Sequence, residues 1–243
     1  MKIAIMSDIH GNSEALSEVL TDIEKQSVDK IICMGDLVGY GPYPNEVVNT
    51  FIDQKIPSTL GNHDLATFDM ELLNDLTGIA HESILLTLDI LGKDEKKYLE
   101  KLPKSIDCRN FHFVHASPPD NVRGYITKKS VNEIKYLFSQ FDSKLCFIGH
   151  THLLAMYHLV NNELKHESME QGKLKLDPEK KYIINVGSVG QPRDGIPKAK
   201  YVIFDEDDYL LEIRFIDYDV KKVQNKILEL GFPRKNAEFL GPI

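Results

Sequence analysis

The stretch KIAIMSDIHGN, residues 2–12, sets the interpretation of the whole chain. Its first part, Lys2–Ser7, is a short apolar run typical of a buried β-strand, and the polar residues Asp8 and His10 follow it at once. The next segment, Ser13–Gln26, carries its apolar side chains at the spacing of one helical face. We therefore predict a strand, a polar turn and an amphipathic helix, in that order.

The same order recurs along the first half of the chain. Asp29–Met34 reads as a second buried strand, Pro44–Lys55 as a helix with proline at its start, and Ile56–Leu60 as a third strand. Repeated strand–helix–strand units imply parallel pairing with right-handed crossovers. The segment Leu65–Leu102 is mostly helical in pattern and stops before Pro103.

The second half has a different character. Phe111–Val114 and Leu145–Ile148 are apolar runs that predict strands. Ala155–Ile216 alternates short strand-like runs with polar turns, which suggests an antiparallel meander. Val220–Leu230 is the last amphipathic helix and ends at Gly231. Together these patterns predict an α/β fold, with mixed sheets flanked by helices.

Composition narrows the class of protein. The chain has 243 residues, 42% hydrophobic and 27% charged, and its formal net charge is −8. This is the balance of an ordinary globular protein, and no apolar run approaches the ~18 residues that span a bilayer. Asp8 interrupts the N-terminal apolar stretch, so we expect no signal peptide and a cytoplasmic location. No linker or repeat divides residues 1–243, so we expect a single domain. The negative net charge argues against a nucleic-acid partner, and the short apolar runs argue against a membrane partner.

Five apolar runs each lead into a short polar cluster that contains His, Asp or Asn. The five clusters are Ser7–Asn12, Gly35–Gly39, Gly61–Asp64, His115–Pro118 and Gly149–His152. Ligands of open α/β sheets bind outside the carboxyl ends of the strands, so we expect the clusters to converge on one rim. Glycines precede Asp36, Asn62 and His150, where they would allow sharp turns and a close approach to a ligand.

The chemistry of these clusters favours a metal centre. Asp8-X-His10 and His150-X-His152 each place two side chains on one face of an extended chain. Imidazole and carboxylate without thiolate suit Mn, Fe, Zn or Ni. The candidate ligands are Asp8, His10, Asp36, Asn62, His115, His150 and His152. Because only two of them are carboxylates, a pair of divalent ions would stay partly positive and attract phosphate.

These motifs resemble the calcineurin-like metallophosphoesterase family, in the family's order across residues 8–152. The segments Gly187–Arg193 and Gly39–Pro42 further resemble its small bacterial and archaeal phosphodiesterase-like branch. The resemblance implies a four-layer α/β/β/α sandwich with two mixed β-sheets and a binuclear centre. It also implies two divalent metal ions as cofactors, with Mn favoured and Fe, Zn or Ni as alternatives.

The resemblance assigns roles by motif position. The first metal would take Asp8, His10, Asp36 and His152. The second metal would take Asp36, Asn62, His115 and His150, so that Asp36 bridges the pair. A hydroxide between the metals would attack phosphorus in line. His63 would contact the phosphate and protonate the leaving oxygen, and Asn62 and Arg193 would also bind the phosphate.

Other side chains near the motifs have simpler interpretations. Asn12 can touch phosphate or cap the first helix, and capping is favoured. Tyr40 and Tyr43 can stack on a substrate base, but packing of their loop is favoured. Arg193 can equally be a surface charge. His112 should point away from the site and be structural.

The resemblance leads us to expect a hydrolase for a small soluble phosphate ester, with a phosphodiester or nucleotide favoured. A dinucleoside polyphosphate hydrolase, a phosphomonoesterase and a scaffold that has lost catalysis are the alternatives. A nuclease would need a basic groove, which this acidic chain does not offer. The Asp-Arg-Gly of protein Ser/Thr phosphatases is absent, because Gly39-Tyr40-Gly41 stands in its place and Asp64 replaces their Glu. Substrate, metal and oligomeric state stay open.

Overall fold

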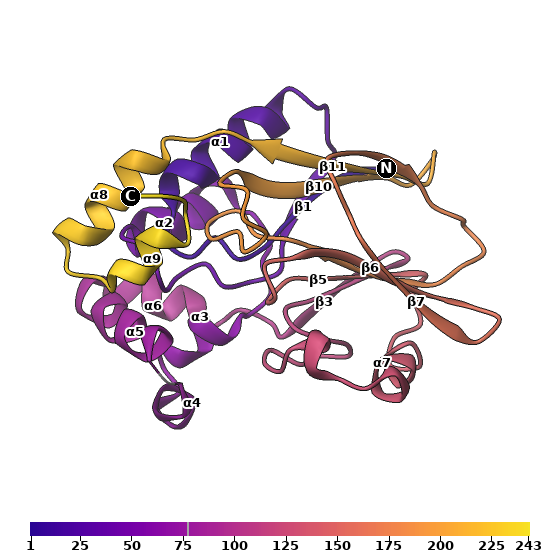
Figure 1. Cartoon of the computed structure of the whole chain (residues 1–243), viewed down its shortest axis with the longest axis horizontal. Helices are drawn as coiled ribbons and strands as arrows, with labels where there is room; N and C mark the ends of the chain where they lie inside the picture. The colour runs from indigo at the N-terminus through magenta and orange to yellow at the C-terminus, as the bar shows by residue number, and fades with distance from the viewer. Residues whose placement is uncertain (77) are drawn as a thin grey trace.

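The computed structural model of the chain describes residues 1–76 and 78–243, and it contains two β-sheets that face each other with helices outside them (Figure 1). The first sheet has the order β2 (Lys30–Cys33), β1 (Lys2–Met6), β10 (Ala199–Asp205), β11 (Leu210–Ile216) and β8 (Gly172–Lys175). The second has the order β3 (Ser105–Cys108), β4 (Phe111–Val114), β5 (Leu145–Ile148), β9 (Tyr182–Val186), β6 (Leu154–Val160) and β7 (Glu163–Ser168). Both sheets are mixed, because β1–β2, β4–β5 and β5–β9 pair in parallel and the other neighbours pair antiparallel.

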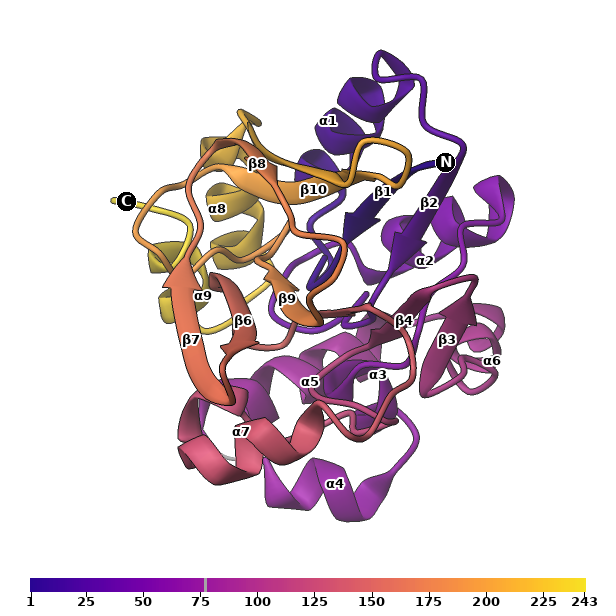
Figure 2. The same cartoon turned by 90° about the vertical axis from the view of Figure 1, so that its right-hand side faces the viewer.

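Helices cover the outer faces of both sheets. Figure 2 shows α1 (Ser13–Glu24) and α2 (Pro44–Gln54) beside the first sheet, and α7 (Val131–Leu137) beside the second. The remaining helices are α3 (Asn62–Ala66), α4 (Met70–Asp75), α5 (Ile79–Ile90), α6 (Lys93–Leu99), α8 (Val220–Glu229), α9 (Arg234–Glu238) and the 3₁₀ turn η1 (Ile126–Lys128). This arrangement is the predicted four-layer α/β/β/α sandwich. The single-domain assignment stays a prediction.

Strand periodicity divides the core into layers. Alternate residues of β1 point to opposite faces, so Ile3 and Ile5 pack between the two sheets while Ala4 and Met6 pack against α1. The layer between the sheets is rich in aromatic rings, among them Phe111, Phe113, Phe147 and Phe204. These layers fix the carboxyl ends of β1, β2, β4 and β5 relative to one another, which positions the loops that follow them.

The local predictions for the first half are largely confirmed. The Asn12 side chain accepts a hydrogen bond from the N–H of Ala15 at 3.1 Å, so it caps α1 as expected. The third strand is wrong: within Ile56–Leu60 only Ser58 forms an isolated bridge with Cys33. Pro57 has no N–H to offer a ladder, and the Leu60 N–H donates to the carbonyl of Pro103 instead.

The predicted meander is also wrong. β8 leaves the second sheet to pair with β11, and β9 lies between β5 and β6. All five residues of β9 are buried, as suits a central strand covered on both faces. The antiparallel hairpins β6–β7 and β10–β11 are the parts of the meander that exist. Four elements were not predicted: β3, the turn η1, the helix α7, and the short helix α9 that follows Pro233.

No helix in the described part of the chain is long and apolar enough to cross a membrane. Cys33, Cys108 and Cys146 are all free.

Candidate metal centre

The loops that follow β1, β2, β4 and β5 bring the predicted side chains together in one buried cluster. Three sets of potential metal ligands have their ligand atoms within 4.8 Å of one another: Asp8, His10 and His152; His10, Asp36 and His63; and Asp36, His115 and His150. The sets share members, so they form one continuous cluster. The expected convergence of the polar clusters on one rim is therefore what the structure has.

The two carboxylates lie at the centre of this cluster. One Asp8 oxygen is 3.7 Å from His10 Nε2 and 3.3 Å from His152 Nε2. One Asp36 oxygen is 3.6 Å from His10 Nε2 and 3.3 Å from His115 Nε2. A single oxygen of Asp36 thus faces both ends of the cluster, which is the geometry that a bridging ligand needs.

The cluster also brings lone pairs against one another. His10 Nε2 and His152 Nε2 are 3.1 Å apart. His115 Nε2 is 3.1 Å from Asn62 Oδ1 and 3.2 Å from His150 Nδ1. A proton can satisfy one such contact, but a cation between the atoms would satisfy all the facing lone pairs at once. The donor set of nitrogen and oxygen atoms therefore fits divalent metal ions.

Backbone carbonyls fix the tautomers of three imidazoles. In His10, His115 and His152 the Nδ1 atom lies 3.0, 2.7 and 2.5 Å from the carbonyls of Val38, Met34 and Gln191, respectively. A carbonyl can only accept, so each Nδ1 carries the proton and each Nε2 presents a lone pair to the cluster. His150 is the opposite case, because its Nδ1 faces the cluster and its buried Nε2 has no hydrogen-bond partner.

Five of the predicted ligands have a left-handed backbone. The φ angles of Asp8, His10, Asp36, His150 and His152 are 56°, 49°, 54°, 66° and 61°. A non-glycine residue in this region costs about 1 kcal/mol or more, and such residues gather at functional sites. The surrounding structure therefore holds these loops in a conformation that they would not adopt by themselves.

Close approach of the backbone explains why a glycine, Gly149, precedes His150. A Cβ atom at Gly149 would overlap the Ser7 hydroxyl and the Asp8 carboxylate. Without it, the His150 N–H comes within 2.9 Å of Asp8 Oδ2 and donates to it. The glycine therefore lets the β5 loop lie directly on the β1 loop.

Burial and mutual charge set the protonation of the cluster. Burial raises the pKa of Asp8, but the facing His152 and His10 outweigh it and hold that pKa well below its usual range. Burial also opposes ionisation of Asp36, and His115 again holds its pKa low. Burial lowers the pKa of His115 too, yet Asp36 raises it to about 9. Burial lowers the pKa of His150 to about 3 and that of His152 to about 4. The ionised carboxylates and the neutral imidazoles of His150 and His152 are in the forms that bind cations, whereas His115 would release a proton on binding one.

His63, which belongs to the set with His10 and Asp36, lies on the first turn of α3. Its N–H donates to Asp36 Oδ1 at 2.8 Å, and its ring lies 4.9 Å from that of His10 and 4.4 Å from that of Tyr40. The Nδ1 atom is buried without a hydrogen-bond partner. Burial holds the pKa of this imidazole well below its usual value.

Arg193 lies on the loop that follows β9, half-buried. Its Nη2 donates to Gln191 Oε1 at 3.2 Å, and its guanidinium lies 5.9 Å from the centre of the Tyr40 ring. Tyr40 is 8% exposed and packs on His10, so the packing role expected for it is what the structure has. Tyr43 precedes α2 as its N-cap residue. His112 lies outside the cluster, with Nδ1 2.8 Å from Asp107 and Nε2 2.7 Å from the Pro119 carbonyl.

Sequence reasoning missed several residues that support the cluster. Asp64 accepts four backbone N–H bonds, from Gly61, Asp36, Leu37 and Val38. Burial and the nearby Asp36 raise the pKa of Asp64 to about 7, against the four donors that favour its carboxylate. Its place in the Gly61–Asp64 cluster was a signal for this role.

Two more supporting residues come from separate parts of the chain. The Tyr125 ring stacks on His150 with centroids 4.3 Å apart and an interplanar angle of 21°. Asn185, wholly buried in β9, donates to the Gly149 carbonyl and to the Thr151 hydroxyl. No motif marks Tyr125, whereas a lone amide in the apolar run Tyr182–Val186 is a detectable signal.

The fold and this cluster define a class of protein. Residues 1–209 match the family profile of the calcineurin-like phosphoesterase superfamily domain, and the chain belongs to that superfamily. Proteins of this class hydrolyse phosphate esters and use divalent metals, and the three sets of ligand atoms are this chain's candidates for holding them.

Individual relatives cover nearly the whole chain. It is 40% identical to an uncharacterized protein of Methanocaldococcus jannaschii over 98% of both sequences. A crystal structure of a metallophosphoesterase from Sphaerobacter thermophilus is 34% identical, with a TM-score of 0.85 over 99% of this chain and 98% of that one. A hypothetical protein from Pyrococcus horikoshii shares the fold at 17% identity, with a TM-score of 0.78 over 98% of this chain and 97% of that one.

Proposed function

We propose that this chain is a binuclear metal-dependent phosphoesterase that hydrolyses a small soluble phosphate ester, with a phosphodiester or nucleotide as the favoured substrate. The observation that carries the proposal is the position of Asp36. One of its oxygens lies within 3.6 Å of His10 Nε2 and within 3.3 Å of His115 Nε2, so one carboxylate can serve two adjacent ions. Such paired sites suit in-line displacement at phosphorus.

The cluster divides into two sets of ligands. The first ion would be held by Asp8, His10, Asp36 and His152, and the second by Asp36, Asn62, His115 and His150. When bound, the two ions, with Mn favoured, would supply Lewis acidity and lower the pKa of a water molecule between them. The carbonyl partners of His10, His115 and His152 hold the proton on each Nδ1 and fix the direction of each ring, so that Nε2 is the nitrogen that would bind an ion.

His63 is the proposed general acid. Its ring is buried beside His10, and its Nδ1 has no protein partner to compete for the proton. Burial disfavours the imidazolium form of His63, but the negative charge of a bound phosphate would favour it. Substrate binding would therefore promote protonation of His63. His63 would then deliver that proton to the leaving oxygen.

Asn62 and Arg193 are the proposed phosphate contacts. The guanidinium of Arg193 keeps donors free beyond its single bond to Gln191 and can engage two phosphate oxygens. The neutral, buried Tyr40 stands where protein phosphatases carry their phosphate-binding arginine. A site with less positive charge suits a phosphodiester monoanion better than a monoester dianion, which supports the diester preference.

Metal analysis combined with ester turnover tests the proposal. Protein loaded with Mn should hold two ions per chain and hydrolyse bis(p-nitrophenyl) phosphate faster than p-nitrophenyl phosphate. His63→Ala should keep both ions and lose turnover, most severely for poor leaving groups, by roughly 10²–10⁴-fold. His81→Ala, on α5 and outside the cluster, is the matched control. Absence of metal, or no turnover of either ester, would overturn the proposal.

A further inference from the structure

The last helices, α8 and α9, lie beyond the residues 1–209 that match the family profile. In Figure 1 these yellow helices lie on the same side of the molecule as α2 and α5. We call residues 220–243 the C-terminal cap. Its apolar side chains, including Val223, Ile227 and Leu240, are buried in a cluster of their own that also takes in Leu86 and Ile90 of α5.

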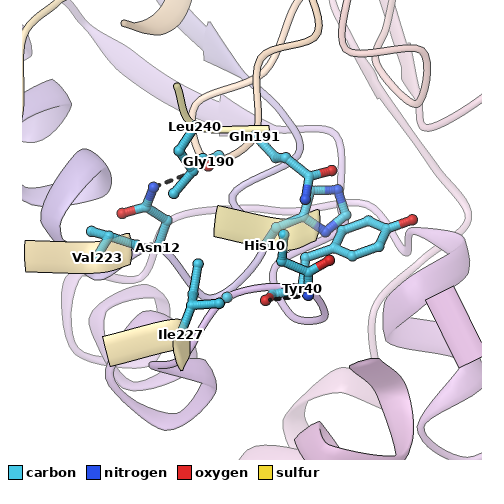
Figure 3. A pocket seen from close by; sticks show the side chains of 10 residues that line it. His10, Asn12, Tyr40, Gly190, Gln191, Val223, Ile227 and Leu240 are labelled. Atoms are coloured by element: carbon cyan, nitrogen blue, oxygen red, sulfur yellow. Dashed lines mark hydrogen bonds between the residues drawn. The ribbon is translucent and has the colours of Figure 1, made fainter. Parts of the chain in front are cut away.

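The C-terminal cap meets the loops of the metal centre along a tight seam. Figure 3 shows Val223, Ile227 and Leu240 lining one side of a cavity and His10 and Tyr40 lining the other. The cavity measures only about 10 Å³, enough for one water molecule at most. It is therefore too small to hold a substrate, and the seam is a packed contact between the cap and the site.

A buried side-chain amide of the cap forms a hydrogen bond with the loop that follows β2. Asn236 of α9 is 0% exposed, and its Nδ2 donates to the carbonyl of Tyr40 at 2.9 Å. The same nitrogen donates to the Ser83 hydroxyl on α5, also at 2.9 Å. Tyr40 has a φ of 62°, so this bond holds a residue whose backbone is in the left-handed region.

An aromatic ring of the cap lies against Arg193. The guanidinium carbon is 5.7 Å from the centre of the Phe239 ring and 5.9 Å from the centre of the Tyr40 ring. Both distances are within the range of cation–π contacts. An arginine side chain has many rotamers in solution, and contacts with two rings restrict it to a few.

We infer that the C-terminal cap completes the phosphate-binding part of the site, with Phe239 and Asn236 as positioning residues for Arg193 and Tyr40. The inference rests on the proposed function, since it assigns the cap a role in binding the phosphate ester. Phe239 preorganises the Arg193 guanidinium from one side, and Asn236 holds the Tyr40 backbone that supports it from the other. The cap acts on substrate affinity, and none of its residues is among the proposed metal ligands.

Substitution of Phe239 tests this role. Phe239 is half-buried, so Phe239→Leu should fold, keep its apolar packing and lose the ring face. We expect Mn content equal to wild type, and a KM for bis(p-nitrophenyl) phosphate raised about 3- to 10-fold with a smaller change in kcat. Phe239→Tyr keeps the aromatic ring, so its KM should equal that of the wild type. Leu228→Ala, on the exposed side of α8, is the control for a lost apolar group in the cap.

A second measurement does not depend on turnover. Phenylglyoxal modifies accessible arginines, and the rate at Arg193 can be followed by mass spectrometry. Phe239→Leu should raise that rate at least threefold over wild type and over Leu228→Ala. An unchanged rate together with an unchanged KM would overturn the inference. If wild type hydrolyses neither ester, the proposed function fails, and the modification rate alone still decides whether Phe239 positions Arg193.

Discussion

Replacement of Asn185 by leucine should weaken the protein far more than its single position in β9 suggests. The Asn185 side chain accepts from the Gly187 N–H at 3.0 Å, and it donates to the Gly149 carbonyl and to the Thr151 hydroxyl. It therefore joins the loop that carries His150 to the loop that follows β9. Leucine has a similar volume but can make none of these bonds.

The size of the effect follows from the groups left behind. The Gly149 carbonyl and the Gly187 N–H are buried backbone groups, and each would lose this partner. The Gly149 carbonyl keeps the Thr151 N–H, which donates to it at 2.8 Å, so the Gly187 N–H is the group left without a partner. A buried polar group without a partner costs about 1–3 kcal/mol, so the free energy of unfolding should fall by about that amount. The Thr151 hydroxyl can rotate and still accepts from the Leu153 N–H, so its lost bond to Asn185 contributes little to the fall in the free energy of unfolding.

Urea unfolding of the metal-free protein, followed by circular dichroism, measures this loss directly. Asn49→Leu is the matched control, because Asn49 is exposed and its side chain donates to the half-buried Glu95 near the surface. That variant should stay within about 0.5 kcal/mol of wild type. A loss below about 1 kcal/mol for Asn185→Leu, or one equal to the control, would refute the hydrogen-bond count.

Three further predictions concern the site and the fold. Asp36→Asn should deplete both metals and abolish turnover, as measured by elemental analysis and ester hydrolysis; full activity would show that the bridge is misassigned. Gly149→Ala should weaken metal binding, because its Cβ would overlap the Asp8 carboxylate; an unchanged metal affinity would contradict the close approach. The hydrogen bonds from Arg214 hold the pKa of Asp22 below its usual range, so its carboxylate stabilises the fold above pH ~4 and loses that effect as the pH falls through the lowered pKa. Asp22→Asn should therefore be less stable than wild type at pH 7, and the difference should shrink toward pH 3 in urea titrations; a constant difference would refute this.

Local signals explain which parts of the fold could be predicted. The helix after Asn12 has a capping amide, a helical apolar face and a length typical of helices, all within one short segment. The pairing of β9 depends instead on β5 and β6, which lie elsewhere in the sequence, so no local pattern reveals it. Ile56–Leu60 had an apolar pattern, but Pro57 within it removes a donor that a ladder requires.

The same distinction applies to the candidate site. The predicted ligands each follow an apolar run, so strand topology alone brings Asp8, Asp36 and His150 to one rim. The side chains that pack on them, such as Tyr125 on His150, come from segments without a recognisable motif. Their contribution depends on packing across the chain, which only the three-dimensional structure reveals.

The left-handed residues of the metal centre have a consequence for directed evolution. Glycine adopts such φ angles without strain, so replacing His10 or His152 by glycine would relieve about 1 kcal/mol of backbone strain, set against the packing and the carbonyl hydrogen bond that the buried ring would lose. Backbone strain at these positions therefore gives selection for heat resistance alone a reason to replace the side chains that face the cluster. Selection for stability should therefore be paired with selection for the proposed turnover if the ligand side chains are to be kept.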